Sequence, residues 1–567
     1  MNEKTKTGLE ILEAAILLGI LGDALLRATP WGLNLLIWIA SLVAALIALT
    51  LRRKRALLQR ENLALHAALV AFAAMFIWRD SLTLQFLDVV IMLAILSILS
   101  LPALNIQIKV AGFVHYAAGA IYSGLNAAFA PFFLVFGDIE WAKLPQRGWM
   151  KHAAAVLRGL AIAAPILLVF GGLFMAADAV FEGIVKNTFN IEPDILFGHF
   201  LLFGFLAWIT AGYLRGSLLE NPFATTFTNN TPTPEFLTIK PEKSVVDISE
   251  QPNTTEEAKS ETTATEADKN DAVKNSIFSL GAIEIGVVLG LINLLFLGFV
   301  IVQLRYFFGG MDFVQTTENF KLAEYARRGF FELCWVAGLT LPILLTAHWL
   351  LRKDSTGGEK VFRVLAGINI ALLFVIMFSA VQRMLLYTGN LGYGLTTMRL
   401  YPTAFMLWLA LVFLWFGATV LRGQPKFFAW GALWTALLVV GGLHVLNPDD
   451  LIVRHNVKLM QQGRQFDAVY NSYSLSADAV RPLVNALPQM SFENQCIVKQ
   501  EFSRRWRIEE SEANGFKYSQ VTSRQFPDDL RTFNLSRSQA LNIFAEYPDS
   551  LEISGCPAAP RRHFDDF

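Results

Sequence analysis

Long uninterrupted runs of apolar residues constrain this chain more than any other feature of its sequence. The chain has 567 residues, of which 54% are hydrophobic and only 17% are charged, whereas soluble domains average about 25% charged residues. The apolar residues come in runs of about 17 to 25, the length that a helix needs to cross about 30 Å of hydrocarbon. A soluble fold of this size would interleave polar positions through several separate cores. The sequence therefore predicts an all-α membrane protein.

About twelve segments have the length and apolar content of membrane-spanning helices. The first keeps Glu10, Glu13 and Asp23 and has no clear cleavage site, so we expect a retained helix rather than a signal peptide. The segment 112–136 is the most polar of the set. We expect a polytopic transmembrane bundle of about 11 to 13 helices. In chain order, the segments are 8–26, 31–51, 63–78, 82–104, 112–136, 153–181, 196–214, 277–303, 330–351, 361–381, 403–421 and 427–446.

Composition divides the chain into four parts. Transmembrane helices are expected in 1–218 and again in 277–446. Between them, 219–276 is acidic and rich in Thr and Glu, with too little apolar content to offset its ordering entropy, so we expect a disordered linker. The last part, 447–567, is soluble in character and has apolar residues at helical spacing. It predicts a small, mostly helical tail.

Three short motifs carry local predictions. Gly286 and Gly290 form a small-xxx-small pair, which permits close contact between helices. Ser536 and Gln539 have the spacing of a capping box before a helix at 540–545. Arg79-Asp80-Ser81 is so short a link between two apolar segments that it predicts only a tight connection.

Basic loop residues predict the orientation in the membrane. Arg52-Arg53-Lys54-Arg55 is the strongest basic cluster, and it indicates that its loop and the N-terminus are cytoplasmic. Basic loops further along favour a side that contradicts this orientation if all twelve segments cross. Either 112–136 does not cross as a simple helix, or a neighbouring segment is two helices. We then expect a cytoplasmic linker and an extracytoplasmic tail, where Cys496 and Cys556 could form a disulfide.

Composition and motifs also exclude several functions. The 47 basic and 47 acidic residues balance, and no basic face predicts nucleic-acid binding. The three cysteines lack the spacing of a metal cluster, and no nucleotide, metalloprotease or serine-hydrolase motif occurs. We therefore expect no metal and no cofactor. Cys334, inside an apolar segment, is expected to be a packing residue.

Ionisable residues inside apolar segments are the first candidates for function, because each costs about 2.5 to 3.5 kcal/mol to insert. Asp88, about two turns into its segment, and Glu332, on the same helix side as Arg328, could each belong to a proton or solute site. The alternative for Glu332 is an ion pair with Arg328, one helical turn away. The others are expected to be structural, through snorkelling or packing. These others are Arg158, Asp178, Glu284, His348 and His444, whereas Arg383 belongs with the loops described next.

Two loops rich in Arg and Tyr are the second candidate, and the predicted topology puts both on one side of the membrane. Arg offers a bidentate fork and Tyr an interfacial ring, so the loops could bind an anionic lipid headgroup, a phosphate or a carboxylate. The alternative is ordinary anchoring at the membrane interface. The candidate binding residues are Glu324, Tyr325, Arg327, Arg328, Glu332, Arg383, Tyr387, Tyr393, Arg399 and Tyr401, with Asp88 from the first half.

The second half of the chain resembles a known family. The matching motifs are Phe308-Gly309-Gly310-Met311-Asp312, the segment 323–333, Gln382-Arg383-Met384 with Tyr387, and the segment 393–401. In these the chain resembles the bacterial membrane proteins catalogued as domain of unknown function 4173. The resemblance implies an integral membrane protein of bacterial envelopes, and it brings no activity, cofactor or catalytic residue.

The sequence leaves three classes of function open. We expect a non-enzymatic scaffold or sensor of the bacterial cytoplasmic membrane that uses the tail and the Arg/Tyr loops to bind an envelope protein or an anionic lipid or solute. The first alternative is a transporter or channel that uses Asp88, Glu332 and Arg328. The second is an enzyme on lipid-linked substrates, for which the loops supply Asp312, Glu324 and several arginines but no nucleophile.

Overall fold

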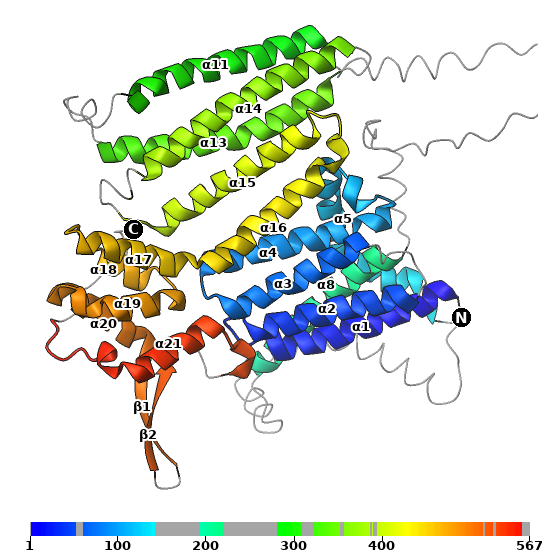
Figure 1. The fold of residues 1–567 in the computed structure, drawn as a ribbon. Coiled ribbons are helices and arrows are strands. Elements are labelled where there is room, and N and C mark those ends of the chain that lie inside the picture. The colour runs from blue at the N-terminus through cyan, green and yellow to red at the C-terminus, as the bar shows by residue number, and fades with distance from the viewer. Residues whose placement is uncertain are drawn as a thin grey trace, which may run out of the picture. The chain divides into compact units, whose positions relative to one another are not determined.

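The chain folds into two compact units, which are described separately (Figure 1). The first contains 1–232, 440–451 and 467–567, and the second contains 233–439 and 452–466. The computed structural model describes residues 2–52, 60–141, 193–219, 281–308, 322–351, 356–385, 388, 394–513, 516–524 and 529–557. The predicted linker beyond Leu219 and the predicted span 153–181 lie outside the described residues.

Antiparallel helices form the membrane part of the first unit. Close packing between α1 and α8 depends on glycine: an added Cβ on Gly19 would lie 2.7 Å from Ala207 Cβ. Small residues let helix backbones approach in the absence of a hydrophobic driving force between them. The helices are α1 (Glu3–Leu26), α2 (Leu33–Arg52), α3 (Arg60–Trp78), α4 (Leu82–Leu99), α5 (Phe113–Phe133) and α8 (Pro193–Leu218).

The α5 segment begins and ends at the same end of this bundle. Gly119, near its start, packs against the backbone oxygen of Ser97, at the end of α4. Just beyond α5 lies the short π-helix η3 (Leu134–Asp138). In it, Asp138 Oδ1 forms an ion pair with Lys4 Nζ at 2.8 Å. Lys4 and the C-terminal end of α4 both lie at the end of the bundle that holds the N-terminus. This geometry favours the alternative in which 112–136 does not cross as a simple helix.

The second unit is built on five apolar helices around one core. Phe330, Phe362, Leu373, Phe413 and Phe416 are among its fully buried side chains. A Cβ added on Gly286 would lie 3.6 Å from a side-chain carbon of Val361, an ordinary contact distance. Nothing lies within 4 Å of a Cβ added on Gly290, so the predicted close glycine contact is wrong for Gly290. The helices are α11 (Ala282–Phe308), α13 (Leu322–Leu350), α14 (Thr356–Leu385), α15 (Thr397–Thr419) and α16 (Phe428–Leu446), the last of which passes into the first unit at residue 440.

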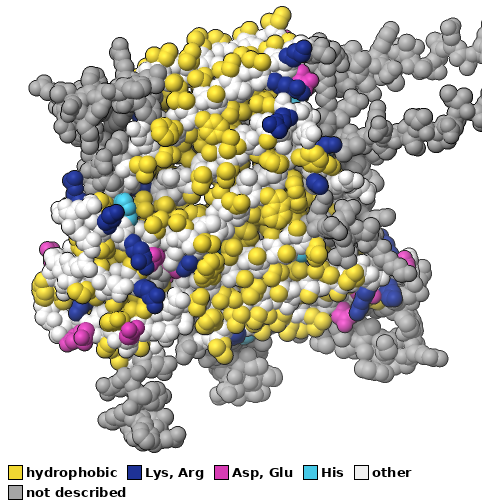
Figure 2. All heavy atoms as spheres, in the orientation of Figure 1, with side chains coloured by type: hydrophobic (Ala, Val, Ile, Leu, Met, Phe, Trp, Pro, Cys, Tyr) yellow, Lys and Arg dark blue, Asp and Glu magenta, His cyan; other side chains and the backbone are white. Residues whose placement is uncertain are grey.

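On the face that Figure 2 shows, hydrophobic side chains cover the helices, and the charged groups gather near helix ends and on the tail. Phe86 and Leu93 of α4, for example, are 66% and 59% exposed. Soluble monomers rarely expose so broad an apolar surface to water. Nine helices in the described residues are long and apolar enough to cross a membrane. The predicted all-α, multi-pass membrane fold is confirmed.

The tail is mostly helical, as predicted, and carries one β-hairpin. Strands β1 (Trp506–Ala513) and β2 (Phe516–Ser523) pair antiparallel, with Trp506 opposite Ser523. The tail's larger helical elements are α17 (Pro448–Gln461), α18 (Ala468–Tyr473), α19 (Val480–Ala486), α20 (Phe492–Arg505) and α21 (Leu535–Glu546). The short 3-10 helices η7 (Ala477–Ala479) and η9 (Leu530–Thr532) lie between them, and η10 (Pro548–Leu551) follows α21.

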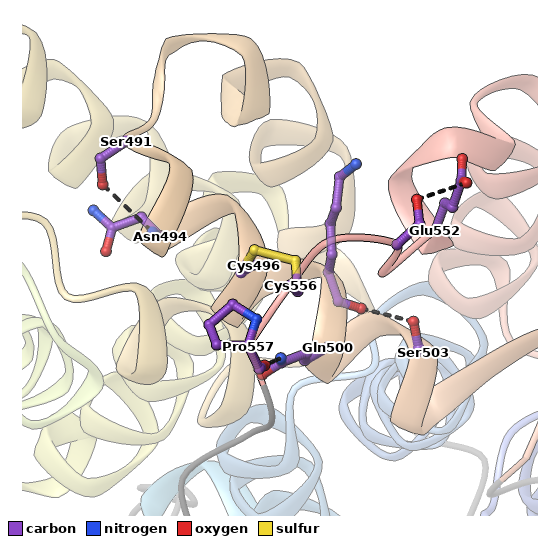
Figure 3. Close-up of a disulfide and its surroundings, with 10 residues drawn as sticks. Ser491, Asn494, Cys496, Gln500, Ser503, Glu552, Cys556 and Pro557 are labelled. Atoms are coloured by element: carbon purple, nitrogen blue, oxygen red, sulfur yellow. Dashed lines mark hydrogen bonds between the residues drawn. A yellow bond between two sulfur atoms is a disulfide. The ribbon is translucent and has the colours of Figure 1, made fainter.

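Two features of the tail bear on sequence predictions. Cys496 and Cys556 form a disulfide that closes a loop of 60 residues and holds the chain after η10 against α20 (Figure 3). The capping-box prediction is wrong, because α21 begins earlier: the side chain of Asn534 accepts from the backbone N–H of Arg537 and caps the helix. Ser536 is therefore free of a capping role and bonds elsewhere.

Candidate functional site

The candidate site begins at the turn between α3 and α4, Arg79-Asp80-Ser81, which the tail covers in the first unit. Arg79 and Asp80 each contact the tail with both side chain and backbone. A three-residue turn exposes the last carbonyls of one helix and the first N–H groups of the next. The tail supplies partners for these groups, so the turn is a docking point and not only a tight connection.

Asp478, in η7 of the tail, is the centre of the contact. Its Oδ1 accepts from Arg79 Nη1 at 3.1 Å, and its Oδ2 accepts from the backbone N–H of Asp80 at 2.9 Å. Ser536 Oγ lies 2.6 Å from the same Oδ1 and 2.8 Å from the carbonyl oxygen of Trp78, so its single proton can serve only one of the two at a time. The carboxylate is 2% exposed, and burial makes each of these charge-assisted bonds stronger than it would be in water.

A second ion pair lies beside the first. Arg537 Nε donates to Asp80 Oδ1 at 2.7 Å, and the two side chains are 10% and 15% exposed. Burial raises the pKa of Asp80, and the charge of Arg537 and its hydrogen bond oppose that rise only in part. The nearby charge of Asp478 adds to the rise. Burying these carboxylates therefore costs desolvation free energy, which the arginines offset only in part.

Asn534 closes the end of α3. Its Nδ2 donates to the carbonyl oxygens of Phe76 at 2.7 Å and of Arg79 at 2.9 Å. Carbonyls in the last turn of a helix lack partners within the helix. The Asn534 amide satisfies two of these carbonyls and so holds the tail against the C-terminal end of α3.

The turn between α1 and α2 is a second docking point. The backbone N–H of Leu33 donates to the carbonyl oxygen of Phe533 at 3.1 Å, and Arg531 Nη1 donates to the carbonyl oxygen of Ala24 at 2.5 Å. A Cβ on Gly32 would lie 2.3 Å from the Phe533 oxygen, so only glycine allows this approach. The tail thus covers two neighbouring turns at one end of the bundle.

Asp449 joins the site from the start of α17. Its Oδ2 accepts from the backbone N–H of Ser476 at 3.0 Å, and its Oδ1 has no hydrogen-bond partner. Burial raises the pKa of Asp449 to about 6; the bonds to Ser476 oppose the rise, and the charges of Asp478 and Asp80 add to it. Asp449 is therefore a carboxyl group of the site that titrates near neutral pH.

The site extends into the membrane part through His444, near the end of α16. Arg79 Nε donates to the carbonyl oxygen of His444 at 2.8 Å. The imidazole Nε2 of His444 lies 3.1 Å from Asp88 Oδ2, and both side chains are fully buried. Asp88 is thus connected to Asp478 by hydrogen bonds through His444 and Arg79.

Two other residues predicted from the sequence, Glu332 and Glu284, lie at the starts of the apolar parts of their helices. Glu332 is exposed on α13, on the same face as Trp335 and Leu339, at the start of the apolar part of the helix. That place fits an interfacial residue and not a group inside the bundle, so the prediction of a buried solute site at Glu332 is not supported. Glu284 accepts from the N–H of Gly281 at the start of α11, in line with a structural role.

The two Arg/Tyr loops are described only in part. Arg399 Nη1 donates to the carbonyl oxygen of Gly394, two bonds join Asn456 of α17 to Leu395, and Arg383 and Tyr401 are partly buried. Where Arg399 is described, it supports its own loop. The remaining candidates lie outside the described side chains, and their binding role stays a prediction: Glu324, Tyr325, Arg327, Arg328, Tyr387 and Tyr393, with Arg158 and Asp178 of the first half.

Sequence reasoning missed most of this site. Asp478, Ser536 and Arg537 lie in a polar tail where such residues are common. Their partners in the α3–α4 turn and at the end of α3 are 399 to 458 residues away in the sequence. One pattern could have drawn attention to the turn: Arg79 and Asp80 stand together between two apolar helices. Across the described residues, no three His, Cys, Asp or Glu side chains are grouped so as to hold a metal ion.

Comparison with known proteins identifies one family. The family model described as "Domain of unknown function (DUF4153)" matches residues 66–486. The resemblance to a family of unknown function is thus confirmed, and the catalogue number 4173 is not. No curated protein and no solved structure matches the chain.

Replacing Arg79 by Ala should release the tail. The change leaves Asp478 buried without its cation, and loss of one partner of a buried pair costs about 3 to 5 kcal/mol. We expect faster proteolysis of the tail in detergent, with the helices unaffected. Arg504→Ala is the matched control, because Arg504 is 61% exposed in its pair with Glu501 and should cost less than about 1 kcal/mol. Equal tail protection in the two variants would contradict the account.

Replacing Asp449 by Asn should remove part of the pH dependence of stability. The pKa is about 6 in the folded chain and about 3.9 in unfolded chains. The folded state binds more protons between these values, so the free energy of unfolding falls as pH rises from about 4 to about 6, by on the order of 3 kcal/mol. Thermal unfolding midpoints should therefore fall over this window in the wild type and less in Asp449→Asn, which keeps an acceptor for Ser476. Identical slopes would refute the assignment.

Proposed function

Since the chain belongs to the DUF4153 family, whose description states no activity, we propose from its geometry that it is a non-enzymatic sensor or scaffold of the bacterial envelope. In this proposal the tail binds a partner outside the cytoplasm, and this binding changes the positions of the membrane helices. The observation that carries the proposal is the docking of the tail on the α1–α2 and α3–α4 turns through Asp478, Arg79, Asp80 and Arg537.

This docking joins two parts that move together. Asp478 and Arg537 bond both to the side chains and to the backbone of helix-connecting turns, so a shift of the tail must displace α3 and α4 or break buried ion pairs. The charged groups of the contact pair with one another, Arg79 with Asp478 and Arg537 with Asp80, and their side chains are mostly buried. This is the arrangement expected of a transducer, because a catalytic site needs acid, base or nucleophile groups that a substrate can reach.

Orientation follows from which end of the first unit the tail covers. Arg52, the first residue of the basic cluster, lies 4.0 Å from Glu10 of α1, toward the end that holds the N-terminus. The tail covers the opposite end, at the α1–α2 and α3–α4 turns. The positive-inside rule puts the basic cluster in the cytoplasm and hence the tail outside. The disulfide of Cys496 and Cys556 supports this side, because disulfides persist in oxidising compartments. For a bacterial chain this is the cytoplasmic membrane.

Transport is the second candidate function, and one observation favours it. Asp88 and His444 form an ionisable pair inside the membrane part, and such residues commonly mark ion or proton pathways. The pair is fully buried, and its described partners lead toward the tail. Solute uptake that depends on Asp88 but not on Asp478 would favour transport over sensing.

The orientation can be tested with the native cysteines. After mild reduction, a membrane-impermeant thiol reagent should label Cys496 and Cys556 in intact cells. In a chain where both are replaced by Ser, Asn2→Cys should react only after lysis, because Asn2 is exposed at the opposite end. The proposed orientation fails if the tail cysteines also need lysis for labelling.

The sensing function can be tested by complementation of a deletion strain. Asp478→Ala should fail to restore the wild-type phenotype at normal membrane abundance, because it uncouples the tail from α3 and α4. Arg504→Ala, in the same tail, should restore it. Full function of Asp478→Ala would reject the docking contact as the route of action.

A further inference from the structure

The hydrogen bonds of His444 determine how many protons the Asp88–His444 pair carries. His444 Nδ1 lies 2.9 Å from the carbonyl oxygen of Val440, one turn earlier in α16. A carbonyl can only accept, so Nδ1 carries a hydrogen. The 3.1 Å contact between Nε2 and Asp88 Oδ2 then needs one further proton, either on the imidazole or on the carboxyl group. Without it, two lone pairs would face each other in a buried site.

Burial makes this proton hard to lose. Both side chains are 0% exposed, and Asp88 Oδ1 has no hydrogen-bond partner. With the proton the pair is neutral overall, as an acid with an imidazole or as a carboxylate with an imidazolium. Loss of the proton leaves a net negative charge in a membrane segment, where isolated charges are costly.

Arg79 is the charged residue that joins the pair to the docking contact, through the carbonyl of His444. In the described parts of α4 and α16, Asp88 and His444 are the only ionisable residues. On α3, His66 bonds its own helix at Asn62 and Arg79 donates to the His444 carbonyl. Other ionisable groups of the packed elements are bonded elsewhere: His115 of α5 to Gly112, Arg215 of α8 to Asp138, His199 of α8 to Asp23, and Asp449 of α17 to Ser476.

We propose that Asp88 and His444 form an intramembrane proton-binding site and that its occupancy sets how firmly the tail is docked. The proton sits between Nε2 and Oδ2 and leaves to the water outside the membrane. Its loss makes Oδ2 and Nε2 repel, which separates α4 from α16 and shifts the His444 carbonyl that Arg79 bonds. Arg79 then holds Asp478 less well. The effect on docking rests on the proposed sensing function, whereas the proton site itself does not.

Asp88→Asn is the sharpest variant for the test. The Asn amide can donate a hydrogen to Nε2 from the position of Oδ2, so the variant imitates the proton-bound pair and cannot release a proton. Its tail should loosen with rising pH only as far as Asp449 contributes, and therefore less steeply than the wild-type tail. In the wild type, tail proteolysis in detergent should increase as pH rises, by up to about tenfold per pH unit, the limit for release of one proton. Asp449 is present in both chains and contributes equally.

Spectroscopy locates the proton itself in the full chain. If the proton is on Oδ2, the infrared carbonyl band of a neutral carboxylic acid should disappear in Asp88→Asn. If it is on Nε2, the 15N spectrum of histidine-labelled protein should contain an imidazolium that His444→Gln removes. The chain has eight histidines, so this difference is assignable. One of the two must be seen near neutral pH, and the absence of both overturns the proton site.

The remaining outcomes also decide the proposal. A wild-type tail equally protected over about pH 5 to 8 and in more alkaline buffer, or an Asp88→Asn tail that loosens with pH as the wild type does, overturns the link to docking. Failure of the sensing function would show differently, as full complementation by Asp478→Ala, and would leave the spectroscopic result unchanged.

Discussion

The carboxylate of Asp478 is the interaction on which the rest of this arrangement depends. It accepts from the Arg79 side chain, from the Asp80 backbone and from Ser536, and so joins a soluble tail to a turn between two membrane helices. A buried carboxylate is unfavourable unless several donors face it. Here those donors come from segments about 60 to 400 residues away, so the contact forms only when the tail and the helices are both folded.

The same contact orders the groups around it. Arg79 reaches from Asp478 to the carbonyl of His444, and the His444 side chain reaches Asp88 inside the membrane part. Asn534 pairs the carbonyls of Phe76 and Arg79 at the end of α3 that would otherwise be unpaired. A helix end in a membrane protein must find such partners, because lipid supplies none. The tail therefore completes the membrane bundle at this end.

The helices could be predicted from the sequence because the bilayer imposes their length. The predicted span 82–104 corresponds to α4 with the turn that follows it, and 427–446 corresponds to α16. Crossing could not be predicted for 112–136, since apolar length alone does not distinguish a helix that crosses from one whose ends meet the same side. Contacts of Gly119 with the end of α4 and of Asp138 with Lys4 favour an α5 whose two ends lie at the same end of the bundle. The polar site was beyond sequence reasoning: Asp88 stood out as a buried acid, but nothing local indicates a partner at His444, 356 residues away.

Hydrogen exchange of the α3–α4 turn tests the central claim most directly. The backbone N–H of Asp80 donates to Asp478, and that of Leu33 in the neighbouring turn donates to Phe533. In the intact chain in detergent, peptides covering 79–81 and 32–33 should exchange slowly, although short turns at helix ends ordinarily exchange fast. Slow exchange that becomes fast when Asp478 is replaced by Ala would support the account. Fast exchange of both turns in the wild-type chain would show that the tail does not rest on the helices, and would contradict it.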